Sequence, residues 1–113
     1  MQGFTMPHIP SMCEGFQESL LKAIRDFEAN LKPGEELAVF CEFGNEVIQV
    51  SKFGCVGGMA AVAVGIDANG ARTRILSSVM SFKFMFKALK HEPGSRSIGF
   101  TVEGNQGETA GNG

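Results

Sequence analysis

The side chains of this 113-residue chain that could do catalytic chemistry are three cysteines and two histidines. Cys13 is the best candidate nucleophile, because it falls on the first turn of an expected helix, where the helix dipole favours a thiolate. A thiolate nucleophile works with an imidazole base, and the sequence offers only His8 and His91 for that role. Neither histidine stands at a motif spacing from Cys13. The sequence therefore predicts no catalytic residues, and a small hydrolase or transferase is the least favoured function.

The same five residues give no metal site, because they lack the short spacings of zinc ligands and form no C-x-x-C pair. The three cysteines, Cys13, Cys41 and Cys55, cannot all pair within one chain. The N-terminus lacks the basic region and apolar core of a signal peptide, and no apolar run approaches the length of a membrane span. We therefore expect free thiols in a reducing cytoplasm, bacterial or that of an infected host cell, with no metal and no other cofactor.

A glycine-rich stretch, SKFGCVGGMAAVAVGIDANGARTRIL (51–76), has the composition of a phosphate-binding loop. A Walker loop, GxxxxGK[ST], uses a lysine and a hydroxyl to meet phosphate and Mg²⁺, and no lysine follows Gly58 until Lys83. A dinucleotide fingerprint needs GxGxxG between a strand and a helix, whereas these glycines are spaced G-x-x-G-G and a strand follows. The stretch therefore predicts strands joined by a bend or bulge and a turn, with no nucleotide chemistry.

Basic side chains gather in one segment of the chain. Residues 1–70 hold four Lys and Arg against nine Asp and Glu, residues 71–102 hold six against one, and the whole chain has a net charge of −2. Arg72 and Arg74 are two apart, so they project from one face of an expected strand, and three lysines follow at helical spacing. The alternative is a solvated face that only keeps the protein soluble. The candidate site for an anion or a partner surface is the group Arg72, Arg74, Lys83, Lys87, Lys90 and Arg96.

The charge pattern also narrows the class of partner. Extended nucleic acid is disfavoured because the net charge is negative and the aromatic residues among the basic ones look buried. A small phosphorylated ligand, an acidic protein surface or the acidic half of the protein itself fits better. Opposite charges on two parts of one chain favour self-association, so we expect a homo-oligomer. Sixteen Phe and Met residues, with no Trp or Tyr, indicate either a Phe/Met core or a partly exposed apolar interface.

Positioning these side chains requires a helix and a meander of strands. Ser11 and Glu14 form an S-x-x-E capping box, and apolar residues then recur every three or four positions until Pro33-Gly34. The third expected strand is apolar on both faces, which favours a central place in the sheet with both faces covered. Turn and glycine signals separate four strands, at 36–43, 46–53, 59–66 and 71–78.

Residues 79–91 fit two patterns. Three phenylalanines from Phe82 to Phe86 alternate as in a strand, but the apolar residues from Val79 to Leu89 also form a helical stripe. Good helix formers, a capping serine before them and the Pro93-Gly94 stop favour the helix. A last strand is expected at 97–102.

The sequence thus predicts an α+β fold of order α-β-β-β-β-α-β. Its sheet is expected to have four to five mainly antiparallel strands, with the N-terminal helix and a second helix packed on one face. Residues 1–10 are expected to be an extended lead-in, residues 11–102 a single domain, and residues 103–113 a disordered glycine-rich tail.

The segment from Leu37 to Phe100 resembles an uncharacterised family of small bacterial and prophage-encoded domains. The likeness lies in a strand ending near GIDANGARTRIL, then an apolar helix, then RSIGF (96–100), and it covers about half the chain. The resemblance implies an α+β fold and a phage context, and it carries no activity. Small phage proteins of this kind often work by binding, either blocking a host defence complex or sequestering a nucleotide signal.

The favoured function is a non-enzymatic binding protein that self-associates and docks on a macromolecular partner, such as a phage-encoded inhibitor of a host defence system. The second function is sequestration of a small anionic ligand, such as a cyclic nucleotide or dinucleotide messenger, near a subunit interface. That ligand would be held by Arg72, Arg74, Lys83, Lys87 and Arg96. The sequence does not decide between the two, and it names no partner.

Overall fold

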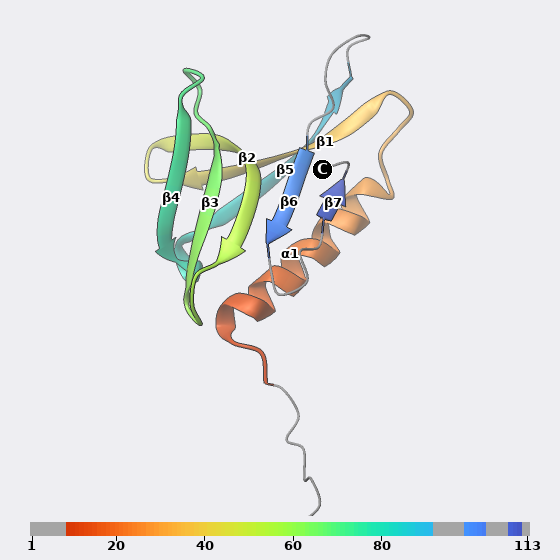
Figure 1. The fold of residues 1–113 in the computed structure, drawn as a ribbon. Helices are drawn as coiled ribbons and strands as arrows, with labels where there is room; N and C mark the ends of the chain where they lie inside the picture. Colours follow the sequence, from red (N-terminus) through yellow and green to blue (C-terminus); the bar gives the residue numbers. More distant parts are fainter. Residues whose placement is uncertain (1–8, 92–98, 104–108, 112–113) are drawn as a thin grey trace, which may run out of the picture.

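A computed structural model describes residues 9–91, 99–103 and 109–111 of the chain. One helix lies against a strongly bent sheet (Figure 1). The elements in chain order are α1 (Met12–Glu28), β1 (Glu35–Phe43), β2 (Glu46–Cys55), β3 (Ala60–Ile66), β4 (Arg72–Ser78), a 3₁₀ turn η1 (Val79–Ser81), β5 (Lys83–Lys90), β6 (Gly99–Glu103) and β7 (Thr109–Gly111).

Helix α1 begins at the predicted capping box. The Glu14 amide donates to the Ser11 hydroxyl oxygen at 3.1 Å, and the Ser11 amide donates to the Glu14 carboxylate at 2.9 Å. These two bonds satisfy amides that have no partner inside the helix. The helix ends at Glu28, several residues before the predicted stop at Pro33-Gly34. The side chains that α1 buries against the sheet are Cys13, Gln17, Leu20, Leu21 and Ile24.

The sheet has the order β4-β3-β2-β1-β5, and each neighbouring pair is antiparallel. Strand β2 is long enough to pair with two different strands along the same edge. Its first half pairs with β1, and residues 52–54 pair in parallel with β6, which in turn pairs with β7. The register shifts between Val50 and Lys52, so a bulge separates the two halves. Strands β1 and β5 consequently run across behind β2, β3 and β4 (Figure 1).

A glycine allows the close approach of β3 to β2 beside this bulge. A Cβ atom on Gly65 would lie 2.0 Å from the Gln49 carbonyl oxygen and 2.9 Å from the Val50 Cα. Both neighbours are backbone atoms, which cannot rotate away as a flexible side chain can. The glycine-rich stretch is therefore architectural, as its spacing predicts: it makes strands, a bulge and a turn.

The second predicted helix is wrong. Residues 79–91 form the 3₁₀ turn η1 and the strand β5, which pairs with β1 from Glu42↔Lys83 to Glu35↔Lys90. The order of elements therefore has a strand in place of the second helix, and the α+β class holds with one α-helix among the described residues. The physical reason is packing, because the alternating phenylalanines of this segment contact other phenylalanines of the core, and this packing outweighs the local helix propensity.

Phenylalanines form the centre of the core. Phe53 is fully buried, and its ring centroid lies 5.7 Å from Phe16, 5.4 Å from Phe82 and 5.2 Å from Phe84. Several of these contacts are tilted or edge-to-face, the arrangements that aromatic quadrupoles favour. Phe27 of α1 meets Phe86 of β5 in the same way at 5.9 Å. Three methionines are exposed and so do not belong to this core: Met12, Met59 and Met80.

A disulfide corrects the expectation of three free thiols. Cys13, on the first turn of α1, is bonded to Cys55, at the end of β2, and their Cα atoms are 6.0 Å apart. The Cys13 amide also donates to the Gly58 carbonyl oxygen at 2.9 Å. The disulfide thus fastens the start of the helix to the β2–β3 connection, and only Cys41 keeps a free thiol.

Two parts of the predicted tail segment form strands in the structure. Glu103 is the last residue of β6, and residues 109–111 form β7, which pairs antiparallel with β6. The rest of the predicted tail and residues 1–8 of the predicted lead-in lie outside the described residues.

Candidate functional site: the outer face of strands β3 and β4

The structure does not bring the described members of the predicted basic group together in one patch. Arg72 and Arg74 lie on β4, at one end of the strand order, whereas the three lysines lie on β5, at the other end. Because β5 is a strand, its side chains alternate, so Lys90 is on the opposite face of the strand from Lys83 and Lys87. Arg96 lies outside the described residues.

The lysines of β5 are balanced by neighbouring groups of β1. Lys83 Nζ lies 3.2 Å from the Glu42 carboxylate, and Lys87 Nζ lies 5.5 Å from the centroid of the Phe40 ring. Lys90 is directly opposite Glu35 in the strand register. The acidic and basic parts of the sequence therefore meet here within the protein itself.

One of the two histidines, His91, also contacts residues in and next to the β1–β5 pair. His91 Nδ1 lies 2.7 Å from a Glu36 carboxylate oxygen, and the His91 amide donates to the Gly34 carbonyl oxygen at 2.8 Å. These contacts hold the histidine at the start of β1. His8 lies outside the described residues.

The two arginines of β4 are different from the lysines. Arg72 and Arg74 are both exposed, and no carboxylate in the described part of the chain lies within ion-pair distance of either one. Their side chains lie on the outer face of the sheet, because the intervening positions, such as Ile75, face the core. These guanidinium groups are therefore available to an anionic partner.

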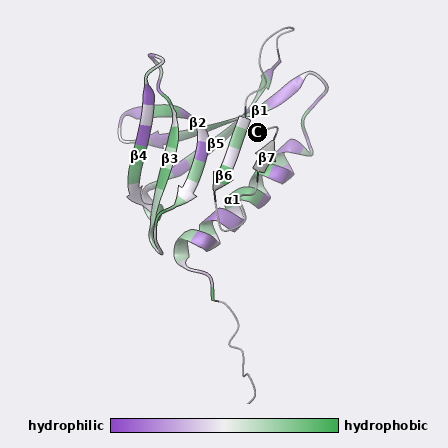
Figure 2. Cartoon of the chain, in the orientation of Figure 1, coloured by the Kyte–Doolittle hydropathy of each residue, from purple (hydrophilic) through white to green (hydrophobic). Residues whose placement is uncertain are grey.

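Apolar side chains surround the arginines on the outer face. Leu76 and Ile66 are 66% and 49% exposed, although a leucine or isoleucine is ordinarily buried. Direct cross-strand pairs bring Ile66 to Arg72 and Val62 to Leu76. Figure 2 shows the apolar colour along β3, and along β4 a hydrophilic first part followed by an apolar part. We call this surface the β3–β4 face, defined by Val62, Val64, Ile66, Arg72, Arg74 and Leu76.

No described element covers the β3–β4 face. The opposite side chains of these strands, such as Ala63 and Ile75, are buried in one core with Leu20 and Ile24 of α1. Helix α1 therefore packs on the inner side of the sheet, as Figure 1 also shows. The outer side is left to solvent or to a partner.

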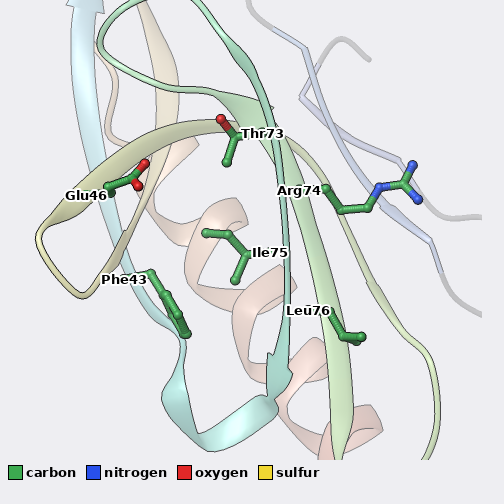
Figure 3. A pocket seen from close by; sticks show the side chains of 6 residues that line it. All are labelled: Phe43, Glu46, Thr73, Arg74, Ile75 and Leu76. Carbon is green, nitrogen blue, oxygen red and sulfur yellow. The ribbon is translucent and has the colours of Figure 1, made fainter.

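A shallow groove of about 310 Å³ borders the edge of β4. Its far wall is the end of β1 and the start of β2, which contribute Phe43 and Glu46. In Figure 3, Thr73 and Ile75 lie on the groove side of β4, whereas Arg74 and Leu76 lie on its other side. The groove therefore joins the β3–β4 face around the edge of β4.

The nucleophile considered from the sequence has no free thiol, because Cys13 is in the disulfide. The remaining thiol, that of Cys41, is fully buried, and desolvation by burial raises its pKa above the ordinary value. A thiol in this state is protonated at neutral pH and is a poor nucleophile. Among the residues that the structure describes, no three His, Cys, Asp or Glu side chains gather as they would around a metal ion.

Comparison with protein-family models, with curated proteins and with solved structures finds no match for this chain. In the described ranges, no helix has the length and apolar character that crossing a bilayer requires.

Sequence reasoning found the arginines of the β3–β4 face and missed its apolar part. The signal was present, because Leu76 continues the two-residue phase of Arg72 and Arg74 onto the same side of the strand. The exposure of Ile66 corrects the expectation that the third strand is covered on both faces, because no described element packs on its outer side.

Proposed function

We propose that the protein is a non-enzymatic binding protein that docks on a protein partner through the β3–β4 face. The observation that carries the proposal is a sheet face that no described element covers, on which two arginines without an ion-pair partner among the described residues lie among exposed apolar side chains. Arginine is enriched at protein interfaces, and lysine and glutamate are depleted there. An exposed group of large apolar residues is likewise typical of an interaction surface.

The chemistry of the face favours a partner with carboxylates. A guanidinium group binds a carboxylate through two parallel hydrogen bonds, and the apolar surroundings of Arg72 and Arg74 would exclude water from such a pair. Val62, Ile66 and Leu76 would contact apolar side chains of the same partner. A complementary surface is therefore acidic at its centre and apolar around it.

Sequestration of a small anionic ligand is the second candidate from the sequence. The structure separates the arginines on β4 from the lysines on β5, and small-molecule sites are ordinarily concave. Thermal denaturation with a panel of cyclic nucleotides and dinucleotides tests this candidate. A rise in melting temperature that is lost in Arg72→Ala/Arg74→Ala would replace the docking proposal with a nucleotide-binding one.

Self-association through this face is disfavoured by charge, although a homo-oligomer remains a prediction from the sequence. Two copies joined at β4 would gather four guanidinium groups from Arg72 and Arg74 on one narrow surface. Light scattering measures the oligomeric state directly. A dimer that dissociates on Leu76→Asp would identify the second copy as the occupant of the face.

Site-specific photo-crosslinking tests the proposed function. A benzoylphenylalanine at position 64, in the middle of the face, should give a discrete protein adduct in the cells that produce the chain. The adduct should disappear in the Arg72→Glu/Arg74→Glu background, because carboxylates would then face carboxylates. The matched control carries the crosslinker at Glu18, which is exposed on α1 and should give no adduct. Absence of an adduct at position 64, or an adduct that survives the charge reversal, would overturn the proposal.

A further inference from the structure

We infer that the free edge of β4 accepts an extended peptide segment of the partner as an added strand. This inference rests on the proposed function and specifies how the partner is bound. Strand β4 is seven residues long and pairs only with β3 within the described part of the chain. An added strand would satisfy its unpaired backbone groups, which is a recurring mode of peptide recognition.

The hydrogen-bond phase of the β3–β4 ladder identifies these backbone groups. The Val79 amide donates to the Met59 carbonyl oxygen at 2.7 Å, and at the other end the Asp67 amide donates to the Ala71 carbonyl oxygen at 2.9 Å. In an antiparallel ladder, hydrogen-bonded pairs recur at every second residue. The odd-numbered residues of β4 therefore bond to β3. The residues whose N–H and C=O groups point to the free edge are Arg72, Arg74 and Leu76.

This edge carries the charges of Arg72 and Arg74, but it lacks the lysines, prolines and bulges that protect exposed strands most often from pairing. Natural edge strands carry lysines, prolines or bulges that discourage addition of another strand. Strand β5, at the other end of the sheet, has lysines at 83, 87 and 90, whereas β4 has neither lysine nor proline and pairs with β3 without a register shift. Of these two edges, β4 is the one open to pairing.

The surroundings of the edge predict the side chains of the added segment. In an antiparallel pair, residues opposite each other have side chains on the same face of the sheet. Residues opposite Arg74 would therefore lie on the outer face, where a carboxylate fits the guanidinium groups. The alternate residues would point into the groove beside Phe43 and Ile75, where an apolar side chain fits. The segment is thus extended, with acidic and apolar residues in alternation.

A synthetic peptide provides the probe. The probe is a fluorescein-labelled octapeptide in which glutamate and valine alternate, and its binding is measured by fluorescence polarisation. It should bind the wild-type protein, and Arg74→Glu should weaken binding by at least about tenfold through like-charge repulsion. Lys32→Glu changes the net charge equally at an exposed position away from β4, so it should leave the affinity unchanged. Equal melting temperatures of the two variants would establish that both are folded.

N-methylated peptides distinguish strand addition from simple charge attraction. In antiparallel addition the glutamate amides bond to β4 and the valine amides point away. Methylation of two glutamate amides should reduce the affinity by at least about tenfold, whereas methylation of two valine amides should leave it within about twofold. The reverse pattern would indicate parallel addition at the same edge.

Equal binding of both methylated peptides, or no binding of the parent peptide, would overturn strand addition. The crosslinking experiment at position 64 is independent of the peptide result. A charge-dependent crosslink without strand addition would leave the docking function standing with a different binding mode. Failure of both experiments would overturn the function as well.

Discussion

At the scale of single residues, the cysteines depart furthest from the sequence expectation. Cys13 and Cys55 are 42 residues apart and belong to no local sequence motif. Their pairing is therefore determined only by the tertiary fold. Cys41 behaves as predicted, because strand alternation places it in the core. The three thiols thus differ in chemistry although nothing in their spacing separates them.

Counting reactive thiols tests these assignments. The native protein should show no thiol that reacts rapidly with Ellman's reagent, because Cys41 is buried and its raised pKa keeps it protonated. Unfolding in guanidinium chloride without reductant should expose one thiol, and reduction of the unfolded chain should expose three. Three reactive thiols before reduction would contradict the disulfide.

Gly65 provides a second test at this scale. Gly65→Ala should lower the free energy of unfolding by at least about 1–3 kcal/mol, because the new Cβ would collide with the backbone of β2. Gly15→Ala is the matched control, since no atom outside its own helix lies within 4 Å of a Cβ placed there. That change should stabilise α1 by about 0.5–1 kcal/mol. Urea denaturation measures both, and an unchanged midpoint for Gly65→Ala would show that β2 and β3 can separate there.

At the scale of elements, the sequence predicts α1 and the β1–β4 meander because each has a local cause. The capping box fixes the start of α1, and turn residues such as Gly44, with φ of 63°, separate the strands. Strand β5 is not predictable in this way, because its residues satisfy both a helical and a strand period. Its partner β1 is far earlier in the chain, from Glu42↔Lys83 to Glu35↔Lys90, so only the assembled fold decides between them.

The capping box gives a prediction for α1. Ser11→Ala should lower the free energy of unfolding by about 1 kcal/mol, because the Glu14 amide loses its acceptor. Ser19→Ala alters an exposed serine in the middle of the same helix and should be neutral or slightly stabilising. Urea midpoints of the two variants give the comparison. Equal effects of the two changes would mean that the cap contributes nothing.

At the scale of the whole molecule, the candidate site emerges from parts that the sequence groups differently. The sequence places Arg72 and Arg74 on one face, which follows from their spacing alone. It puts the lysines of 83–90 on one side of a helix, and it joins them to the arginines on the condition that this helix packs beside the strand. The true β5 strand carries these lysines to the other end of the sheet, where β1 supplies Glu42 and Phe40 as neighbours.

The disulfide links helix α1 to the sheet, so its loss should destabilise the whole fold. Reduction, or Cys13→Ser/Cys55→Ser, should lower the free energy of unfolding by about 2–5 kcal/mol, because the unfolded chain regains the freedom of a long loop. Cys41→Ala should leave the difference between oxidised and reduced protein unchanged. Identical urea midpoints in the presence and absence of reductant would contradict a stabilising disulfide.

The same covalent bond turns residues 13–55 into a closed ring that holds all of α1 except Met12, and all of β1 and β2. A protease that cuts the exposed α1–β1 connection at Lys32, or the β1–β2 turn at Asn45, would open this ring without releasing a fragment. The nicked chain would still travel as one species in a denaturing gel, and it would separate into two only after a reducing agent is added. Attack by proteases in this part of the molecule would therefore not by itself dismantle the protein.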